Sequence, residues 1–298
     1  MSNLAQRVLV AVIAIPIVLF IVLYKPLGFY ALAVMLSGMT VWEYYGLART
    51  KGIAPQNILG VVLTMITALI FGHYRLKYLF GWDTDIVIGI AMAALFLGAF
   101  IILAVELFRN LPNPIEQTAI TLFGAVYIGI GCGSLFGIFD SLAFWITSKE
   151  MYSHYMPGLF ILTVLVSIWV CDSAAYFAGR AFGKHKFFER VSPKKTWEGA
   201  IAGFIASIAL WAVAPMVIEP LAFLGTTNCI IIGIIAGSIG QIGDLGKSLL
   251  KRDAGVKDSS NLIPGHGGVL DRLDSIIFVS PVLFILLNAL HYLRLLGV

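Results

Sequence analysis

Long apolar runs, separated by short polar stretches, occupy most of this sequence. A membrane-crossing helix needs about 20 consecutive, mostly apolar residues. Nine segments have this character, near residues 8–24, 27–46, 58–72, 86–106, 117–139, 158–178, 199–222, 228–250 and 275–296. The third run is short, and two prolines and a glutamate interrupt the seventh. Because the runs are continuously apolar and lack the alternation of barrel strands, they predict an all-α, polytopic integral membrane protein with about nine transmembrane helices.

The composition agrees with this interpretation. The 298 residues are 59% hydrophobic and 12% charged, with a mean hydropathy of +0.94. Soluble domains are roughly 45–50% apolar and about 25% charged, so a soluble protein of this composition would lack a polar surface. The first run, Val8–Tyr24, is longer than the apolar core of a signal peptide and no clear cleavage site follows it. We therefore expect an uncleaved first helix.

The distribution of Lys and Arg predicts the orientation in the membrane. With the N-terminus in the cytoplasm, the inner loops carry fourteen of these residues and the outer loops carry five, leaving aside Lys247 at a helix end. Because cytoplasmic loops are enriched in positive charge, the two richest polar loops face the cytoplasm, and the protein lies in the cell inner (cytoplasmic) membrane. The net charge of +4 comes from these loops and gives no reason to expect nucleic-acid binding.

The polar residues divide the chain into two parts. Residues 1–157 are predicted to form N-terminal transmembrane helices, and residues 158–298 to form a C-terminal catalytic region with cytoplasmic loops. Glu43, beside Tyr44 and Tyr45, is interpreted as an interfacial residue of an aromatic belt, although a functional role stays open. The three cysteines have no metal-ligand spacing and are interpreted as small core residues.

One polar island, residues 248–274, contains most of the candidate chemistry. Four cations alternate with four carboxylates around a Gly-rich turn; the cations are Lys251, Arg252, Lys257 and Arg272. Charged groups near a membrane are costly and usually functional. Such cations can neutralise the charge that develops during phosphoryl or nucleotidyl transfer. A basic loop that only attracts anionic lipids would explain the cations, but it would not explain the acids or the turn.

Two aspartates in this region are the candidate metal ligands. Asp244 continues a helical face that begins with Gly233, Gly237 and Gly240 and reaches Ser248, and the glycines themselves are explained by close helix packing. Asp271 is predicted at the start of the last helix, sharing a face with Asp274. Magnesium takes one or two carboxylates and completes its shell with water and substrate phosphates. We therefore expect Asp244 and Asp271 to bind one or two such ions.

Other residues suit phosphate recognition. His266, Gly267 and Gly268 form a turn whose backbone N–H groups and imidazole can donate to phosphate oxygens. Asp172, Tyr176 and Gly179 share a helical face. Shortly before another predicted helix stand four further candidates, Ser192, Lys194, Lys195 and Thr196. A helix N-terminus adds positive potential to such a site. Trp197, next in sequence, can stack on a base or anchor at the interface, and anchoring is the commoner role.

These motifs resemble a known family. The stretch from Ser248 to Asp274, the segment Asp172-Ser173-x-x-Tyr176 and the run Ser192–Gly199 are similar to the signature regions of phosphatidate cytidylyltransferases, also called CDP-diacylglycerol synthases. The resemblance covers the C-terminal half, whereas the N-terminal half matches only in character. It implies transfer of the cytidylyl group of CTP to phosphatidic acid, metal ligation at Asp244 and Asp271, a Mg²⁺ cofactor with room for a second cation, and often a homodimer.

Other functions remain as alternatives. A related CTP-dependent transferase could act on another membrane lipid, such as an ether lipid or a polyprenol. A transporter would place its polar residues near the middle of the membrane and would commonly show inverted repeats. The polar residues gather instead on one predicted side, and no internal repeat is apparent. The membrane enzyme is therefore the favoured interpretation.

Overall fold

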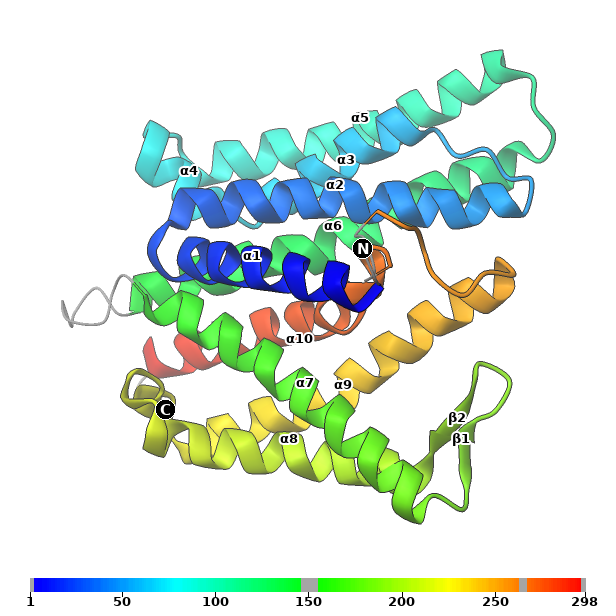
Figure 1. Ribbon diagram of the computed structural model, residues 1–298. Helices are drawn as coiled ribbons and strands as arrows, with labels where there is room; N and C mark the ends of the chain where they lie inside the picture. The colour runs from blue at the N-terminus through cyan, green and yellow to red at the C-terminus, as the bar shows by residue number, and fades with distance from the viewer. Residues whose placement is uncertain (1–2, 146–154, 263–266, 296–298) are drawn as a thin grey trace. The chain divides into compact units, whose positions relative to one another are not determined.

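The protein is largely helical in the computed structural model, which describes residues 3–145, 155–262 and 267–295 (Figure 1). The elements in chain order are α1 (Asn3–Tyr24), α2 (Pro26–Thr50), α3 (Asn57–Ile70), α4 (His73–Phe80), α5 (Thr84–Arg109), α6 (Pro114–Trp145), α7 (Met156–Phe182), β1 (Lys186–Phe188), β2 (Ser192–Thr196), α8 (Trp197–Val217), the 3₁₀ helix η1 (Glu219–Leu224), α9 (Thr226–Asp253) and α10 (Leu270–Leu295). Within the described residues, each of the nine apolar runs is largely helical, which confirms the predicted fold class.

The predicted count of nine membrane crossings is not confirmed. Among the described residues, six helices are long and apolar enough to cross a membrane: α5, α6, α7, α8, α9 and α10. A seventh crossing results if α3 and α4, which meet at a bend of 77°, are taken together as one broken span. Within α1, the stretch Val12–Tyr24 is apolar but shorter than a full span. The structure therefore has six or seven candidate spans.

Three short elements, α4, β1 and β2, were not predicted from the hydrophobic pattern. Helix α4 contains His73, Arg75 and Lys77 among its eight residues, so it has no apolar run. Strands β1 and β2 form an antiparallel hairpin in which Lys186 pairs with Thr196 and Phe188 with Ser192. These elements are short, and none of them has a hydrophobic period long enough to reveal it.

The chain forms two compact units, each with its own core. The first comprises residues 1–21, 25–140 and 250–273. In it, the aromatic rings of Phe29, Tyr30, Phe136 and Phe139 pack together, and the Tyr30 and Phe136 rings stack at 4.7 Å between centroids. Tyr45 is fully buried and donates a hydrogen bond to the backbone carbonyl of Thr121 at 2.7 Å. This bond ties α2 to α6.

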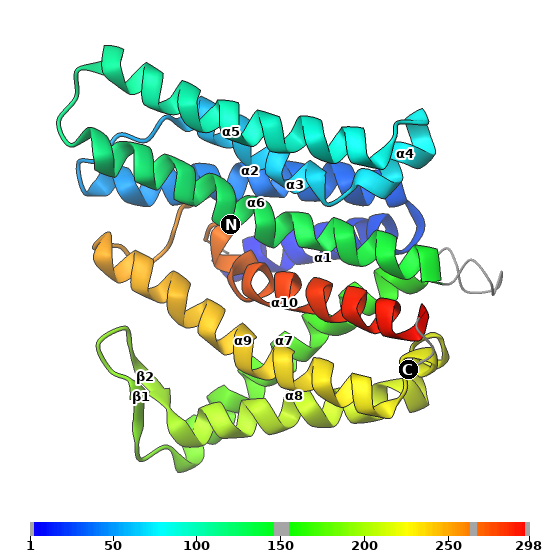
Figure 2. The same ribbon diagram turned by 180° about the vertical axis from the view of Figure 1, so that it is seen from behind.

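The second unit comprises residues 22–24, 141–249 and 274–298. Helix α7 packs against α8, and α9 lies beside α8 in both views (Figures 1 and 2). A Cβ added to Gly233 or Gly237 of α9 would lie 2.9 Å from atoms of Ile208 or Ser207, respectively, on α8. The packing role predicted for these glycines is therefore confirmed. The predicted functional division at residue 157 stays a prediction.

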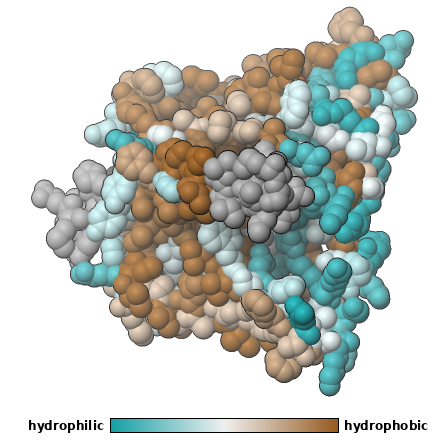
Figure 3. Space-filling model, viewed as in Figure 1, coloured by the Kyte–Doolittle hydropathy of each residue, from teal (hydrophilic) through white to brown (hydrophobic). Residues whose placement is uncertain are grey.

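Polar surface gathers at one end of the second unit. On the face shown in Figure 3, hydrophilic residues cluster around the β1–β2 hairpin, whereas apolar residues cover much of the helical surface. The hairpin joins the C-terminal end of α7 to the N-terminal end of α8. Antiparallel helices thereby bring the predicted polar motifs of α7 and α8 to one place.

Candidate active site

The β1–β2 hairpin presents two lysines beside a helix N-terminus. Lys194 and Lys195 lie on β2, directly before α8. Thr196 caps α8, because its hydroxyl accepts a hydrogen bond from the backbone N–H of Gly199 at 3.3 Å. Phe187 and Trp197 hold the base of the hairpin with an edge-to-face contact, 4.5 Å between ring centroids. Free N–H groups at the start of a helix attract anions, so lysines and helix together favour phosphate.

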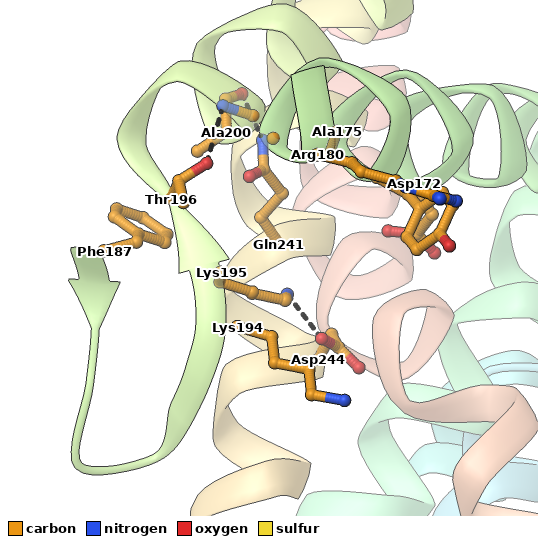
Figure 4. A pocket seen from close by; sticks show the side chains of 13 residues that line it. Asp172, Ala175, Arg180, Phe187, Lys194, Lys195, Thr196, Ala200, Gln241 and Asp244 are labelled. Carbon is orange, nitrogen blue, oxygen red and sulfur yellow. Dashed lines mark hydrogen bonds and ion pairs between the residues drawn. The ribbon is translucent and has the colours of Figure 1, made fainter. Parts of the chain in front are cut away.

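These residues open into a cavity of about 560 Å³ (Figure 4). Its lining comes from α7, the hairpin, α8 and α9 and includes Asp172, Tyr176, Gly179, Arg180, Phe187, Lys194, Lys195, Thr196, Gln241 and Asp244. Ligand pockets generally measure roughly 300–1,000 Å³, so this cavity is large enough for a small organic ligand. The structure thus joins the predicted motif at Asp172 with the predicted motif at Ser192–Thr196.

Asp244, which lines the cavity, belongs to a network of ion pairs. Lys195 contacts Asp244 from the hairpin, as Figure 4 shows, and Lys194 extends in the same direction. On α9 itself, Lys247 lies 2.9 Å from Oδ1 of Asp244, and it also contacts Asp274 of α10. The side chains of Lys247 and Asp274 are each only 10% exposed. Lys247 is therefore shared by two carboxylates in a largely desolvated place, where the loss of its charge leaves a costly unpaired carboxylate.

Asp271 belongs to a separate network in the first unit. Its Oδ1 accepts from Nζ of Lys251 at 2.5 Å, and Oδ2 accepts from the backbone N–H and the hydroxyl of Ser259 at 2.9 and 3.0 Å. The backbone N–H of Gly268 donates to the same Oδ2 at 3.3 Å. Helix α10 begins at Leu270, so Asp271 lies in its first turn, as predicted.

The two glycines before α10 are each required by the local structure, for different reasons. Gly267 has φ +80°, a left-handed conformation that strains other residues. At Gly268 an added Cβ would overlap the hydroxyl of Ser259 and the carboxylate of Glu43. The backbone N–H that we predicted to face phosphate at Gly268 is used here by Asp271. Both glycines therefore have a structural reason in addition to the proposed role in binding.

The remaining predicted residues occupy several positions. Ser192 begins β2, and Ser248 lies on α9, one turn after Asp244. Three of the predicted cations, Arg252, Lys257 and Arg272, have exposed side chains. His266 lies outside the described residues. The structure brings Asp172, Lys194, Lys195, Thr196 and Asp244 together, and it separately brings Lys251, Gly268 and Asp271 together.

The donor chemistry fits a magnesium ion. Within the described ranges no group of three or more His, Cys, Asp or Glu side chains forms a protein-only metal cage. Magnesium needs none, because it binds through one or two carboxylates together with substrate phosphates. Among the described residues, Lys195 and Lys247 each contact one oxygen of Asp244, and Lys251 donates to Oδ1 of Asp271, so lone pairs remain for a cation. A metal site shared by Asp244 and Asp271 stays a prediction.

Sequence reasoning missed several residues of these networks. Lys247 was treated as a helix-end residue, although its spacing of three from Asp244 places both on one helical face. Asp274 was noted as a neighbour of Asp271 but not as a site residue. The interfacial interpretation of Glu43 is wrong: this side chain is 4% exposed and accepts four hydrogen bonds. Its partners are 216 to 227 positions away, so no local pattern could reveal them.

The fold and the site define a polytopic membrane protein with a cationic cavity suited to a phosphate-bearing ligand. Comparison with known proteins identifies the family within this class of membrane proteins. The sequence pattern of the cytidylyltransferase family matches residues 5–290, and the chain belongs to this family.

Individual relatives agree with the family match. The chain is 31% identical over 290 residues to the phosphatidate cytidylyltransferase of Bacillus subtilis, an alignment that covers 96% of this chain and 98% of the relative. It is 35% identical over 292 residues to phosphatidate cytidylyltransferase 5, chloroplastic, of Arabidopsis thaliana, which covers 90% of this chain and 65% of the relative. A third relative, the phosphatidate cytidylyltransferase of Haemophilus influenzae, is 47% identical over 137 residues, 44% of this chain and 47% of the relative.

Proposed function

We propose that this protein transfers the cytidylyl group of CTP to phosphatidic acid, giving CDP-diacylglycerol and pyrophosphate for phospholipid biosynthesis. The observation that carries the proposal is the pairing of Lys195 with Asp244 in a cavity at the N-terminus of α8. Membership of the cytidylyltransferase family and the names of the relatives support the same reaction.

The transfer reaction does not require a strong protein base. A phosphate oxygen of the lipid attacks the α-phosphorus of CTP; a new P–O bond forms, the bond between the α-phosphorus and the bridging oxygen breaks, and pyrophosphate leaves. The second pKa of a phosphate monoester is about 6, so the attacking group is already largely ionised near neutral pH. Positioning and charge neutralisation then supply most of the catalysis.

The residues of this chain divide these tasks. Lys194 and Lys195 neutralise negative charge on the triphosphate of CTP, and the N-terminal N–H groups of α8 orient the triphosphate. Lys251 and its exposed neighbours Arg252 and Lys257 neutralise charge on the lipid phosphate or the leaving group. Asp244 and Asp271 would hold the magnesium ion, which supplies Lewis-acid stabilisation of the phosphate oxygens when bound. A lipid acceptor explains why these groups lie at the ends of apolar helices, since the acyl chains can stay in the bilayer.

We also propose that the protein works in the cytoplasmic membrane of the cell, with the site facing the cytoplasm where CTP is available. The excess of Lys and Arg in the predicted inner loops supports this orientation. The family resemblance further supports a homodimer. Light scattering of the detergent-purified protein, corrected for bound detergent, tests the dimer, and a monomeric mass would contradict it.

A direct assay tests the reaction. Purified protein is incubated with CTP labelled in its cytosine, phosphatidic acid and Mg²⁺, and label is then measured in the organic phase. We expect lipid-linked label that requires phosphatidic acid and disappears with a chelator or in the Asp271→Asn variant. CTP should be preferred over ATP and UTP. Label transferred only to a polyprenol phosphate or an ether lipid would replace the proposed acceptor, and absence of label with every lipid would refute the proposed function.

A further inference from the structure

A buried carboxylate on α2 organises the loop and helix start that contain Asp271. Glu43 Oε1 accepts from the hydroxyl of Ser260 at 2.6 Å and from the backbone N–H of Val269 at 2.9 Å. Its Oε2 accepts from the hydroxyl of Ser259 at 2.8 Å and from the backbone N–H of Leu270 at 2.9 Å. All four donors come from residues within the first compact unit. Four protein donors therefore lie within hydrogen-bond distance of this carboxylate.

Two of these bonds replace a helix cap that the local sequence lacks. Helix α10 begins at Leu270, and the preceding residue, Val269, has no side-chain acceptor. The first N–H groups of a helix have no partner within the helix, and a carboxylate there also interacts favourably with the helix dipole. Glu43 provides both effects from a position more than 200 residues away in sequence. Glu43 is thus bonded to the start of α10, one residue before Asp271.

Ser259 connects Glu43 directly to Asp271. The hydroxyl of Ser259 is 2.8 Å from Glu43 Oε2 and 3.0 Å from Asp271 Oδ2. A serine hydroxyl has one hydrogen, so it can donate to only one of these carboxylates at a time. Gly268 leaves the space in which the three side chains meet, since a Cβ at that position would overlap both Ser259 and Glu43. The two carboxylates consequently share one donor.

We propose that Glu43 is a positioning residue for Asp271. Glu43 fixes the positions of Ser259 and of the first turn of α10. When Asp271 binds a cation, the hydroxyl of Ser259 donates its hydrogen bond to Glu43, and a lone pair on Oδ2 of Asp271 becomes available to the metal ion. This inference rests on the proposed function in one respect only, namely that Asp271 binds the divalent cation. Partners behind metal ligands typically affect metal affinity or activity by roughly 10–100-fold.

The first test is Glu43→Gln, in which an amide N–H₂ replaces one acceptor oxygen. We expect the Mg²⁺ concentration for half-maximal activity to rise roughly tenfold, while kcat at saturating Mg²⁺ and the KM for CTP change by less than about twofold. Binding of Mn²⁺, measured by electron paramagnetic resonance without turnover, should weaken by the same factor. A purely structural role would lower the yield or the thermal midpoint and leave the cation dependence of the folded protein unchanged, and that result would overturn the proposal.

A matched pair of serine variants covers the case in which Glu43→Gln does not fold. Ser259→Ala and Ser260→Ala each remove one hydroxyl donor to Glu43, but only Ser259 also contacts Asp271. We expect weaker Mn²⁺ binding in Ser259→Ala and unchanged binding in Ser260→Ala. Equal effects of the two substitutions would reject the coupling.

The failure of the proposed function can be told apart from failure of this inference. If the wild type makes no lipid-linked label but binds Mn²⁺, the serine pair still measures the coupling of Glu43 to Asp271. If the wild type does not bind Mn²⁺ at all, Asp271 is no cation ligand and the positioning role is rejected with it.

Discussion

Lys195 and Lys247 both contact Asp244, but they differ in how deeply they lie. The Lys195 side chain is 29% exposed and lines the cavity, whereas the Lys247 side chain is 10% exposed and also pairs with Asp274. An ammonium group in a cavity can exchange its protein partner for a substrate phosphate. A buried ammonium group between two carboxylates mainly keeps those carboxylates satisfied. The same residue type therefore has a binding role in one position and a structural role in the other.

Methionine substitutions should separate these roles. Because Lys247→Met leaves Asp244 and Asp274 buried without their shared cation, we expect a loss of about 3–5 kcal/mol in folding stability. Lys195→Met should raise the KM for CTP at least tenfold and change stability little. Thermal unfolding in detergent and CTP titrations of activity measure the two quantities. Equal thermal midpoints for the two variants would contradict the assignment.

Gly268 offers a second test at the scale of single residues. Gly268→Ala should abolish activity and destabilise the protein, because the new methyl group overlaps Ser259 and Glu43. Gly255→Ala is the control: Gly255 has φ +69° but nothing within 4 Å of an added Cβ, so only backbone strain of about 1–2 kcal/mol is expected. The comparison uses thermal midpoints and activity. If Gly255→Ala proved the more harmful change, close approach would not explain Gly268.

The helices illustrate what a hydrophobic pattern can predict. Each apolar run is largely helical in the described part of the chain, because in lipid the backbone must satisfy its own hydrogen bonds and a helix does so within one segment. The β1–β2 hairpin was missed, since Lys186-Phe187-Phe188 and Ser192–Thr196 have too few residues for a period to appear. The sequence likewise predicted lysines before a helix but could not predict that Lys195 reaches Asp244, 49 positions later. Contacts between distant segments depend on packing that no local pattern records.

The cap of α8 is an element where sequence and structure agree. Thr196→Val keeps the side-chain shape but removes the oxygen that accepts the N–H of Gly199. We expect a loss of about 0.5–2 kcal/mol in stability and a weaker affinity for CTP, because the start of α8 lines the cavity. Thr196→Ser keeps the oxygen and should retain both properties. Loss of activity in Thr196→Ser would indicate that the methyl group, not the cap, matters.

At the scale of the whole molecule, charge is distributed unevenly along the chain. The polar residues that line the cavity come from α7, from strand β2 of the hairpin and from α9. The predicted outer loops include Arg75 and Lys77 of α4, and few other cations. If the positive residues set the orientation, the hairpin and α4 lie on opposite sides of the membrane.

Single cysteines can test this orientation. The three native cysteines are free and at most 2% exposed, so they should react poorly with a membrane-impermeant maleimide. Glu189, in the hairpin, and Tyr78, on α4, are both exposed and suit substitution. In intact cells we expect labelling of Tyr78→Cys and no labelling of Glu189→Cys, which should react only after lysis. Because CTP is available only inside the cell, labelling of Glu189→Cys from outside would place the lysines of the hairpin away from their nucleotide and would exclude the proposed site.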